Sequence, residues 1–194
     1  MRLSDFSDSV IRRIACICPA RATPAMERPR APITAGAAGV ALFFADVARA
    51  ADGAARRRIA GRALAWVNAA ERSLRYPRTA YGFPFLPFRS SFGGVGVFHG
   101  RAGVHTVAAR VASLRGDVKA LRAATLRFLD AWRAACARRD LPTEVFAGVA
   151  GFMHAARDFE AHVAVLGPKL GRRALSVGDE AHARVLASLG VKAR

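Results

Sequence analysis

The chain has 194 residues, of which 53% are hydrophobic, and it contains three cysteines. This length suits one domain, the hydrophobic content excludes an intrinsically disordered chain, and three cysteines are too few for the dense disulfide framework of a small secreted module. No stretch offers the roughly 20 uninterrupted apolar residues that cross a bilayer. Asp5, Asp8 and Arg12 interrupt the apolar run that an export signal would need. We therefore expect a soluble protein of the cytoplasm with no transmembrane segment.

Basic residues dominate the charge. The 31 Lys and Arg against 14 Asp and Glu give a net charge of +17, and nearly all of the basic residues are Arg. Two interpretations stand: a field of this sign attracts nucleic acid, acidic peptides or anionic membrane surfaces, or the arginines only cover solvated helix faces. No zinc finger, RNA-recognition signature or long basic block accompanies the charge, so the sequence predicts no specific nucleic-acid partner.

The chain divides at about residue 32. Residues 1–32 contain a short helical candidate at 6–17, which is followed by a stretch punctuated by prolines. From residue 33 to 194 the sequence predicts three helical hairpins. Their approximate ranges are 33–90, 91–140 and 141–190.

The three hairpins are predicted from a four-residue pattern, Gly-x-Ala-Gly, that occurs three times. An apolar stretch with few helix breakers follows each copy, which indicates a helix. The copies are Gly36 to Gly39, Gly100 to Gly103 and Gly148 to Gly151, and the helices that they precede are expected at 40–51, 104–114 and 152–165.

A polar corner and a second helix complete each unit. Asp52-Gly53 and Gly116-Asp117 are the first two corners, and Gly178-Asp179 is the expected third. Pro168 should stop the preceding helix near Leu166. An aromatic and proline-rich stretch at 76–92 reads as an ordered loop packed over the helices. The second helices are amphipathic, with apolar stripes at Ile59, Ala63, Trp66, Val67 and Ala70 and at Val118, Leu121, Thr125, Phe128, Leu129 and Trp132.

The glycines of the three Gly-x-Ala-Gly patterns, which we call tetrads, allow two interpretations. Small residues permit close approach of neighbouring first helices at their N-termini, and glycine permits the positive φ of a tight turn. Exposed N–H groups and the partial positive charge at these N-termini favour an anion, so a ring of them would make a binding site. The alternative is a packing device with no ligand.

The ordered set of motifs resembles the lanthionine synthetase C-like family, which includes the LanC lanthipeptide cyclases. The resemblance rests on residues 33–44, 96–104 and 144–151 and spans about residues 33–190. It implies an all-α chain that forms part of an α/α toroid of the six-hairpin kind, corresponding to the N-terminal repeats. The activity it implies is peptide modification, in which a cysteine thiol adds to a dehydroalanine or dehydrobutyrine and closes a thioether ring.

Zinc activates the thiol in that family, and two cysteines and a histidine of later repeats hold it. Cys16, Cys18 and Cys136 precede no glycine-rich turn, and the chain has no Cys-His pair. No metal ligand and no cofactor-binding residue is therefore assigned. We expect a truncated or zinc-less form with little activity alone.

The resemblance also implies one catalytic position. The family's third repeat carries an acid four places before its first glycine, and Glu144 stands there; the alternative is an acid favoured by the helix N-terminus. His99 precedes Gly100, but the family's His-Gly motif belongs to a later repeat. His105 and His154 are expected to be hydrogen-bonded core histidines.

An incomplete ring would expose apolar surface, so the expected partners are a peptide substrate or a chain that completes the toroid. A different class of function is a non-catalytic basic module that binds an acidic peptide or another polyanion. Glycosidases with the same toroid plan need paired carboxylates, and Glu144 has no evident mate.

Overall fold

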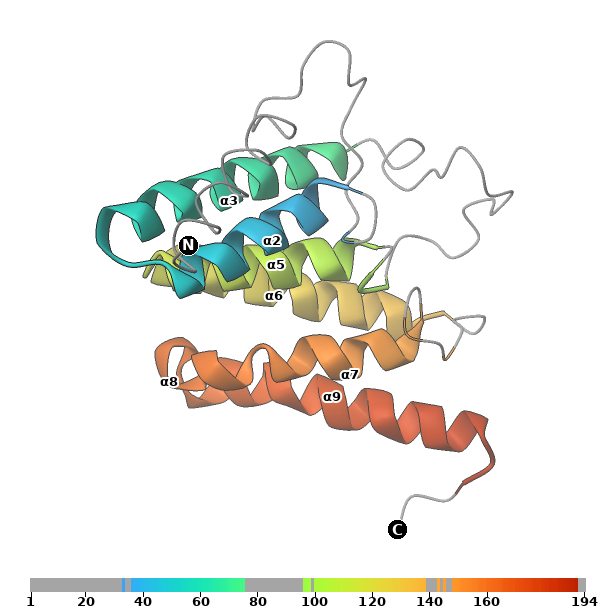
Figure 1. Ribbon diagram of the computed structural model, residues 1–194. Coiled ribbons are helices and arrows are strands. Elements are labelled where there is room, and N and C mark those ends of the chain that lie inside the picture. The colour runs from blue at the N-terminus through green and yellow to red at the C-terminus, as the bar shows by residue number, and fades with distance from the viewer. Residues whose placement is uncertain are drawn as a thin grey trace, which may run out of the picture.

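The computed structural model describes residues 33, 36–75, 96–98, 100–138, 143, 145 and 148–191 (Figure 1). Every regular element within these residues is a helix, so the prediction of an all-α protein is confirmed. None of the described helices is both long enough and apolar enough to span a bilayer. The helix predicted at 6–17 and the loop predicted at 76–92 lie outside the described residues.

The first hairpin consists of α2 (Ala37–Ala50) and α3 (Gly53–Ser73), which pack against each other. Asp52 at the predicted corner is the N-cap residue of α3. The predicted apolar stripe of α3 is correct, because all five of its members, Ile59, Ala63, Trp66, Val67 and Ala70, are buried.

The second hairpin pairs α5 (Arg101–Leu114) with α6 (Val118–Cys136). Gly116 makes the corner with φ of +69°, a conformation that L side chains rarely adopt. Asp117 caps α6, since its Oδ1 accepts a hydrogen bond of 2.9 Å from the backbone N–H of Ala120. Val118 was wrongly placed in the buried stripe: it is 45% exposed at the start of the helix, whereas the other five members are buried.

The third hairpin differs from its prediction. α7 (Val149–Arg157) ends early and leads through a 3₁₀ turn, η2 (Glu160–His162), and a short α8 (Val163–Leu166) to α9 (Pro168–Ser188). The expected helix at 152–165 is therefore broken, although the predicted stop near Leu166 is correct.

The predicted corner at Gly178-Asp179 is wrong, because these residues lie inside α9. The corner falls at Gly167 (φ +82°), and Pro168 takes the first helical position, where its missing N–H and fixed φ are favourable. A Cβ at Gly178 would lie 3.2 Å from Ala156 Cβ, so this glycine allows close packing of α9 on α7.

The hairpins pack side by side in chain order. α5 lies against α2 and α3 on one side and against α7 on the other, and every residue from Ala102 to Ala109 is buried. α2, α5 and α7 all begin at one end of the molecule, which we call the tetrad end; α3, α6 and α9 begin at the opposite end, which we call the corner end (Figure 1).

Candidate functional site

The first glycine of each tetrad is the N-cap residue of a helix. Gly36, Gly100 and Gly148 precede α2, α5 and α7, with φ of −149°, −132° and −107°. These are extended conformations that any residue can adopt, so the first glycines of the tetrads do not use the positive φ that glycine permits.

The second glycine of each tetrad meets a close backbone neighbour. A Cβ at any of these glycines would overlap a carbonyl oxygen six residues earlier in the chain, and a side chain there would force the backbone apart. The pairs of glycine and carbonyl are Gly39 with Ile33, Gly103 with Val97 and Gly151 with Val145.

The segments that lead into the tetrads also contact one another. The backbone N–H of Ile33 donates to the carbonyl of Phe98 at 3.1 Å. A Cβ at Gly103 would lie 2.9 Å from Ile33 Cδ1, and one at Gly151 would lie 3.2 Å from Val97 Cβ. Protein atoms thus fill the space beside the second glycines, which favours the packing interpretation of the tetrads over an anion site.

The predicted acid/base residue, Glu144, lies outside the described residues, and so does His99. The role of Glu144 therefore stays a prediction. Of the three cysteines in the sequence, only Cys136 lies among the described residues.

His105 is buried in α5. Burial, together with the nearby positive charges of Arg127 and Arg101, lowers its pKa to about 4, and Asp130 opposes this only in part. The expected core position is therefore correct, but its Nδ1 has no hydrogen-bond partner among the described residues. His154 is exposed, which contradicts its expected core position.

Cys136 is partly buried at the end of α6. Burial raises the pKa of its thiol, which disfavours the thiolate that binds metals. Among the described residues, no group of three or more His, Cys, Asp or Glu could hold a metal ion. This part of the chain therefore does not fit the zinc site of the family that the sequence resembles.

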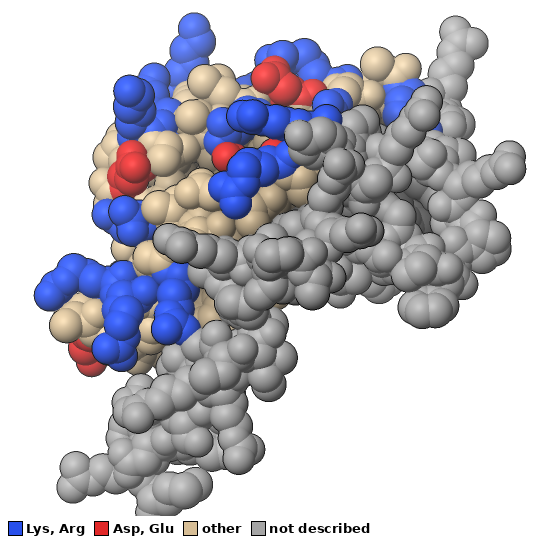
Figure 2. Space-filling view, turned by 90° about the horizontal axis from the view of Figure 1, so that it is seen from above, with Lys and Arg blue, Asp and Glu red and all other residues tan. Residues whose placement is uncertain are grey.

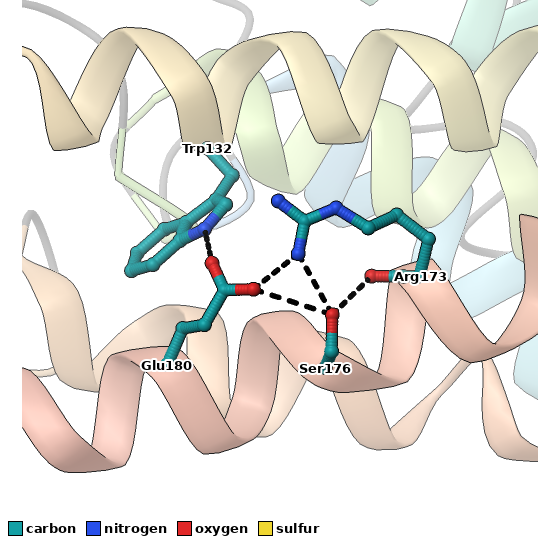
Figure 3. Close-up of polar contacts among 4 residues, drawn as sticks. All are labelled: Trp132, Arg173, Ser176 and Glu180. Carbon is teal, nitrogen blue, oxygen red and sulfur yellow. Dashed lines mark hydrogen bonds and ion pairs between the residues drawn. The ribbon is translucent and has the colours of Figure 1, made fainter.

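A polar cluster links the second and third hairpins (Figure 3). The indole Nε1 of Trp132 on α6 donates to Glu180 Oε2 on α9 at 2.7 Å. The other oxygen of Glu180 accepts from Arg173, whose Nη1 also lies 2.8 Å from Ser176 Oγ. The Arg184 guanidinium carbon lies 5.6 Å from the centroid of the Trp132 ring, within the range of a cation–π contact.

The cluster keeps Glu180 ionised. Partial burial alone would raise its pKa, but hydrogen bonds from Trp132 and Arg173 outweigh that effect and hold the pKa below its ordinary value. Both carboxylate oxygens are engaged, so the group is a link between helices rather than a free acid or base.

Sequence reasoning missed this cluster although a signal was present. Arg173, Ser176 and Glu180 are spaced three and four residues apart, which puts them on one face of a helix. The expected corner at Gly178-Asp179 split that helix in two and hid the shared face.

Comparisons with known protein families, curated proteins and solved structures find no match to this chain. Its relationship to any family therefore rests on the motifs and geometry described above.

Proposed function

We propose that the chain is the N-terminal part of a LanC-like α/α toroid and that it takes part in peptide modification by thioether formation. The observation that supports this most directly is the shared geometry of the tetrads. Each begins a helix at the same end of the molecule, and each second glycine meets the carbonyl oxygen six residues before it.

The packing order supports a curved wall of hairpins. α5 contacts both α2 and α7, so the first helices are neighbours, and the second helices α6 and α9 also touch. We propose that further hairpins, from another segment or a partner chain, continue this wall and complete the ring. Those hairpins would also supply the metal ligands that the described residues lack.

The proposed reaction adds a thiol across a carbon–carbon double bond. The sulfur of a cysteine bonds to the β-carbon of a dehydroalanine, the electron pair of the double bond moves to the α-carbon, and that carbon takes up a proton. Glu144 is the proposed donor of this proton, because the reaction needs a general acid at the enolate carbon. Zinc, where bound, would lower the pKa of the substrate thiol and so favour the nucleophilic thiolate.

The test is a thiol-addition assay of the full chain with glutathione, a peptide that contains dehydroalanine, and added Zn²⁺. We expect slow addition above the uncatalysed rate, and a fall of about a hundredfold, or to background, in Glu144→Gln. Glu160→Gln is the matched control, because it removes an exposed acid at the corner end. A rate equal to that without protein, in the unchanged chain and both variants, would contradict an enzymatic role for this chain.

Zinc content gives a second readout that does not depend on activity. We expect less than one zinc per purified chain. Stoichiometric, tightly bound zinc would overturn the proposal that the ligands come from elsewhere.

A further inference from the structure

Among the described residues, the positive charge is concentrated at the corner end. Residues 49–58, 110–122 and 157–173 surround the three corners, and these 40 residues contain twelve Lys and Arg against four Asp and Glu, a net charge of +8. The other 89 described residues carry eight against five, a net charge of +3. Figure 2 shows Lys and Arg side chains along its left edge, which is the corner end of Figure 1.

Much of this charge is unpaired. Nine exposed basic residues of the corner end form no ion pair with a described residue, and we call them the corner cations. They are Arg56, Arg57 and Arg58 on α3, Arg115, Lys119 and Arg122 at the start of α6, Arg157 at the end of α7, and Lys169 and Arg172 on α9.

Helix stability does not explain where the corner cations lie. A helix N-terminus carries a partial positive charge and favours acids in its first turn. α3, α6 and α9 have no acid in their first turns, and Lys119 and Lys169 are the second residues of α6 and α9. Asp52 and Asp117 at the N-caps offset part of the N-terminal field of α3 and α6, but no acid opposes that of α9, so Lys169 costs stability there and adds to a positive field.

Exposed apolar side chains lie among these cations. Val118, beside Lys119, is 45% exposed, and Val165 in α8 is 50% exposed. Both valines lie at the corner end, because Val118 begins α6 and Val165 belongs to α8, which precedes the third corner. Phe159 is the aromatic residue of the three corner segments, and it is fully buried, so these segments offer no aromatic platform on which bases could stack.

We infer that the corner end is a docking surface for a membrane with anionic lipids. Lys and Arg contact the headgroup phosphates and carboxylates, and the two exposed valines enter the boundary between headgroups and acyl chains. Unpaired cations with apolar residues between them suit this partner better than a nucleic-acid backbone, which offers nothing to the valines. The inference does not depend on the proposed thiol chemistry.

The test measures co-sedimentation of the full chain with vesicles of phosphatidylcholine alone or with an equal part of phosphatidylserine. We expect binding only to the second kind. The double substitution Lys119→Glu with Lys169→Glu should lower the partition coefficient by about thirtyfold or more, given the typical contribution of each basic residue near an anionic surface. Misfolding would not explain the loss, because acids in the first turn suit these helices.

The matched control is Arg72→Glu with Arg75→Glu, which changes the net charge equally at the other end of α3. It should keep binding within about threefold, since these residues lie far from the surface relative to the screening length. Val118→Ser with Val165→Ser should lower binding that persists at high salt. Three outcomes would overturn the inference. The first is an equal loss of binding in the two charge variants, and the second is equal binding of the unchanged chain to neutral and anionic vesicles. The third is full binding by the valine variant together with displacement of the protein from vesicles by single-stranded RNA.

Discussion

Two tryptophans occupy corresponding places in the first two hairpins, thirty and thirty-two residues after the first glycine of the preceding tetrad. Both are buried. Trp132 donates its Nε1 proton to Glu180, whereas Trp66 Nε1 has no hydrogen-bond partner among the described residues. A buried indole N–H without a partner is costly, so the same residue in the same place contributes differently to stability.

The junctions between neighbouring hairpins also differ. The first and second hairpins meet at Ile33, whose N–H donates to the Phe98 carbonyl and whose Cδ1 would lie 2.9 Å from a Cβ at Gly103. The second meets the third through large rings: Phe128 lies 4.8 Å from Phe159 and 5.8 Å from Phe152, and Trp132 lies 4.9 Å from Phe152, between ring centroids. The first junction therefore requires that Gly103 has no side chain, whereas the second depends on a few large rings.

The largest loss is expected in the aromatic junction. Phe128→Ala removes a fully buried ring that contacts two others, and we expect it to lower the free energy of unfolding by about 3–5 kcal/mol. Urea denaturation followed by circular dichroism measures this. Leu126→Ala is the control on the same helix; its side chain is 51% exposed, and its cost should stay below about 1 kcal/mol. Similar costs for the two variants would show that the rings do not hold this junction together.

The small-residue junction should fail through overpacking. The methyl group of Gly103→Ala would overlap the Val97 carbonyl and would lie only 2.9 Å from Ile33 Cδ1 of the first hairpin, and we expect a cost of about 3 kcal/mol. Gly61→Ala on α3 is the control, because nothing lies within 4 Å of its added Cβ. It should stabilise the protein by about 0.5–1 kcal/mol through helix propensity. The two variants make the same chemical change but should alter the free energy of unfolding in opposite directions, which separates the effect of packing from that of helix propensity. Stabilisation by both variants would contradict the close approach at Gly103.

The sequence predicts where the first helices start better than where the last ones end. The tetrads mark the beginnings of α2, α5 and α7 because the second glycine of each must have no side chain where the backbone approaches it closely. The third corner was missed because Gly-Asp looks alike in a turn and inside a helix. Only the competition with Gly167-Pro168, which combines a positive φ with a favourable first helical residue, decides between the two.

The candidate site is less predictable for a physical reason. Helical spacing within α9 could identify the shared face of Arg173 and Glu180, but their partner Trp132 lies 48 residues from Glu180. The raised or lowered pKa values of Cys136 and His105 likewise depend on burial that arises only when distant helices pack.

A pH titration tests whether burial of His105 makes stability depend on pH. The pKa of His105 is lowered to about 4 in the folded protein, so the unfolded chain binds more protons as the pH falls below its ordinary value. Stability is therefore retained above about pH 6.5 and lost progressively toward pH 4, with a loss of about 2 kcal/mol at pH 5 from this group. The measurement is the unfolding free energy between pH 7 and pH 5. His105→Leu should remove about that much of the pH dependence, whereas His154→Leu, at an exposed position, should leave it unchanged; equal slopes in all three proteins would contradict the assignment.

The smallest effect should come from weakening the polar link between Trp132 and α9. Glu180→Gln keeps an oxygen that can accept the indole N–H but removes the charge that attracts Arg173, and this ion pair is partly exposed and screened by solvent. We expect a loss of about 0.5–1 kcal/mol in unfolding free energy at low salt, and less at high salt. The contribution should also fall with pH, since the pKa of Glu180 is lowered and its stabilisation is lost as the folded carboxylate becomes protonated. Asp179→Asn, one residue away and exposed, should change stability by no more than about 0.5 kcal/mol. If Asp179→Asn costs as much as Glu180→Gln, the polar link contributes no more than general surface charge, and the rings alone distinguish the second junction from the first.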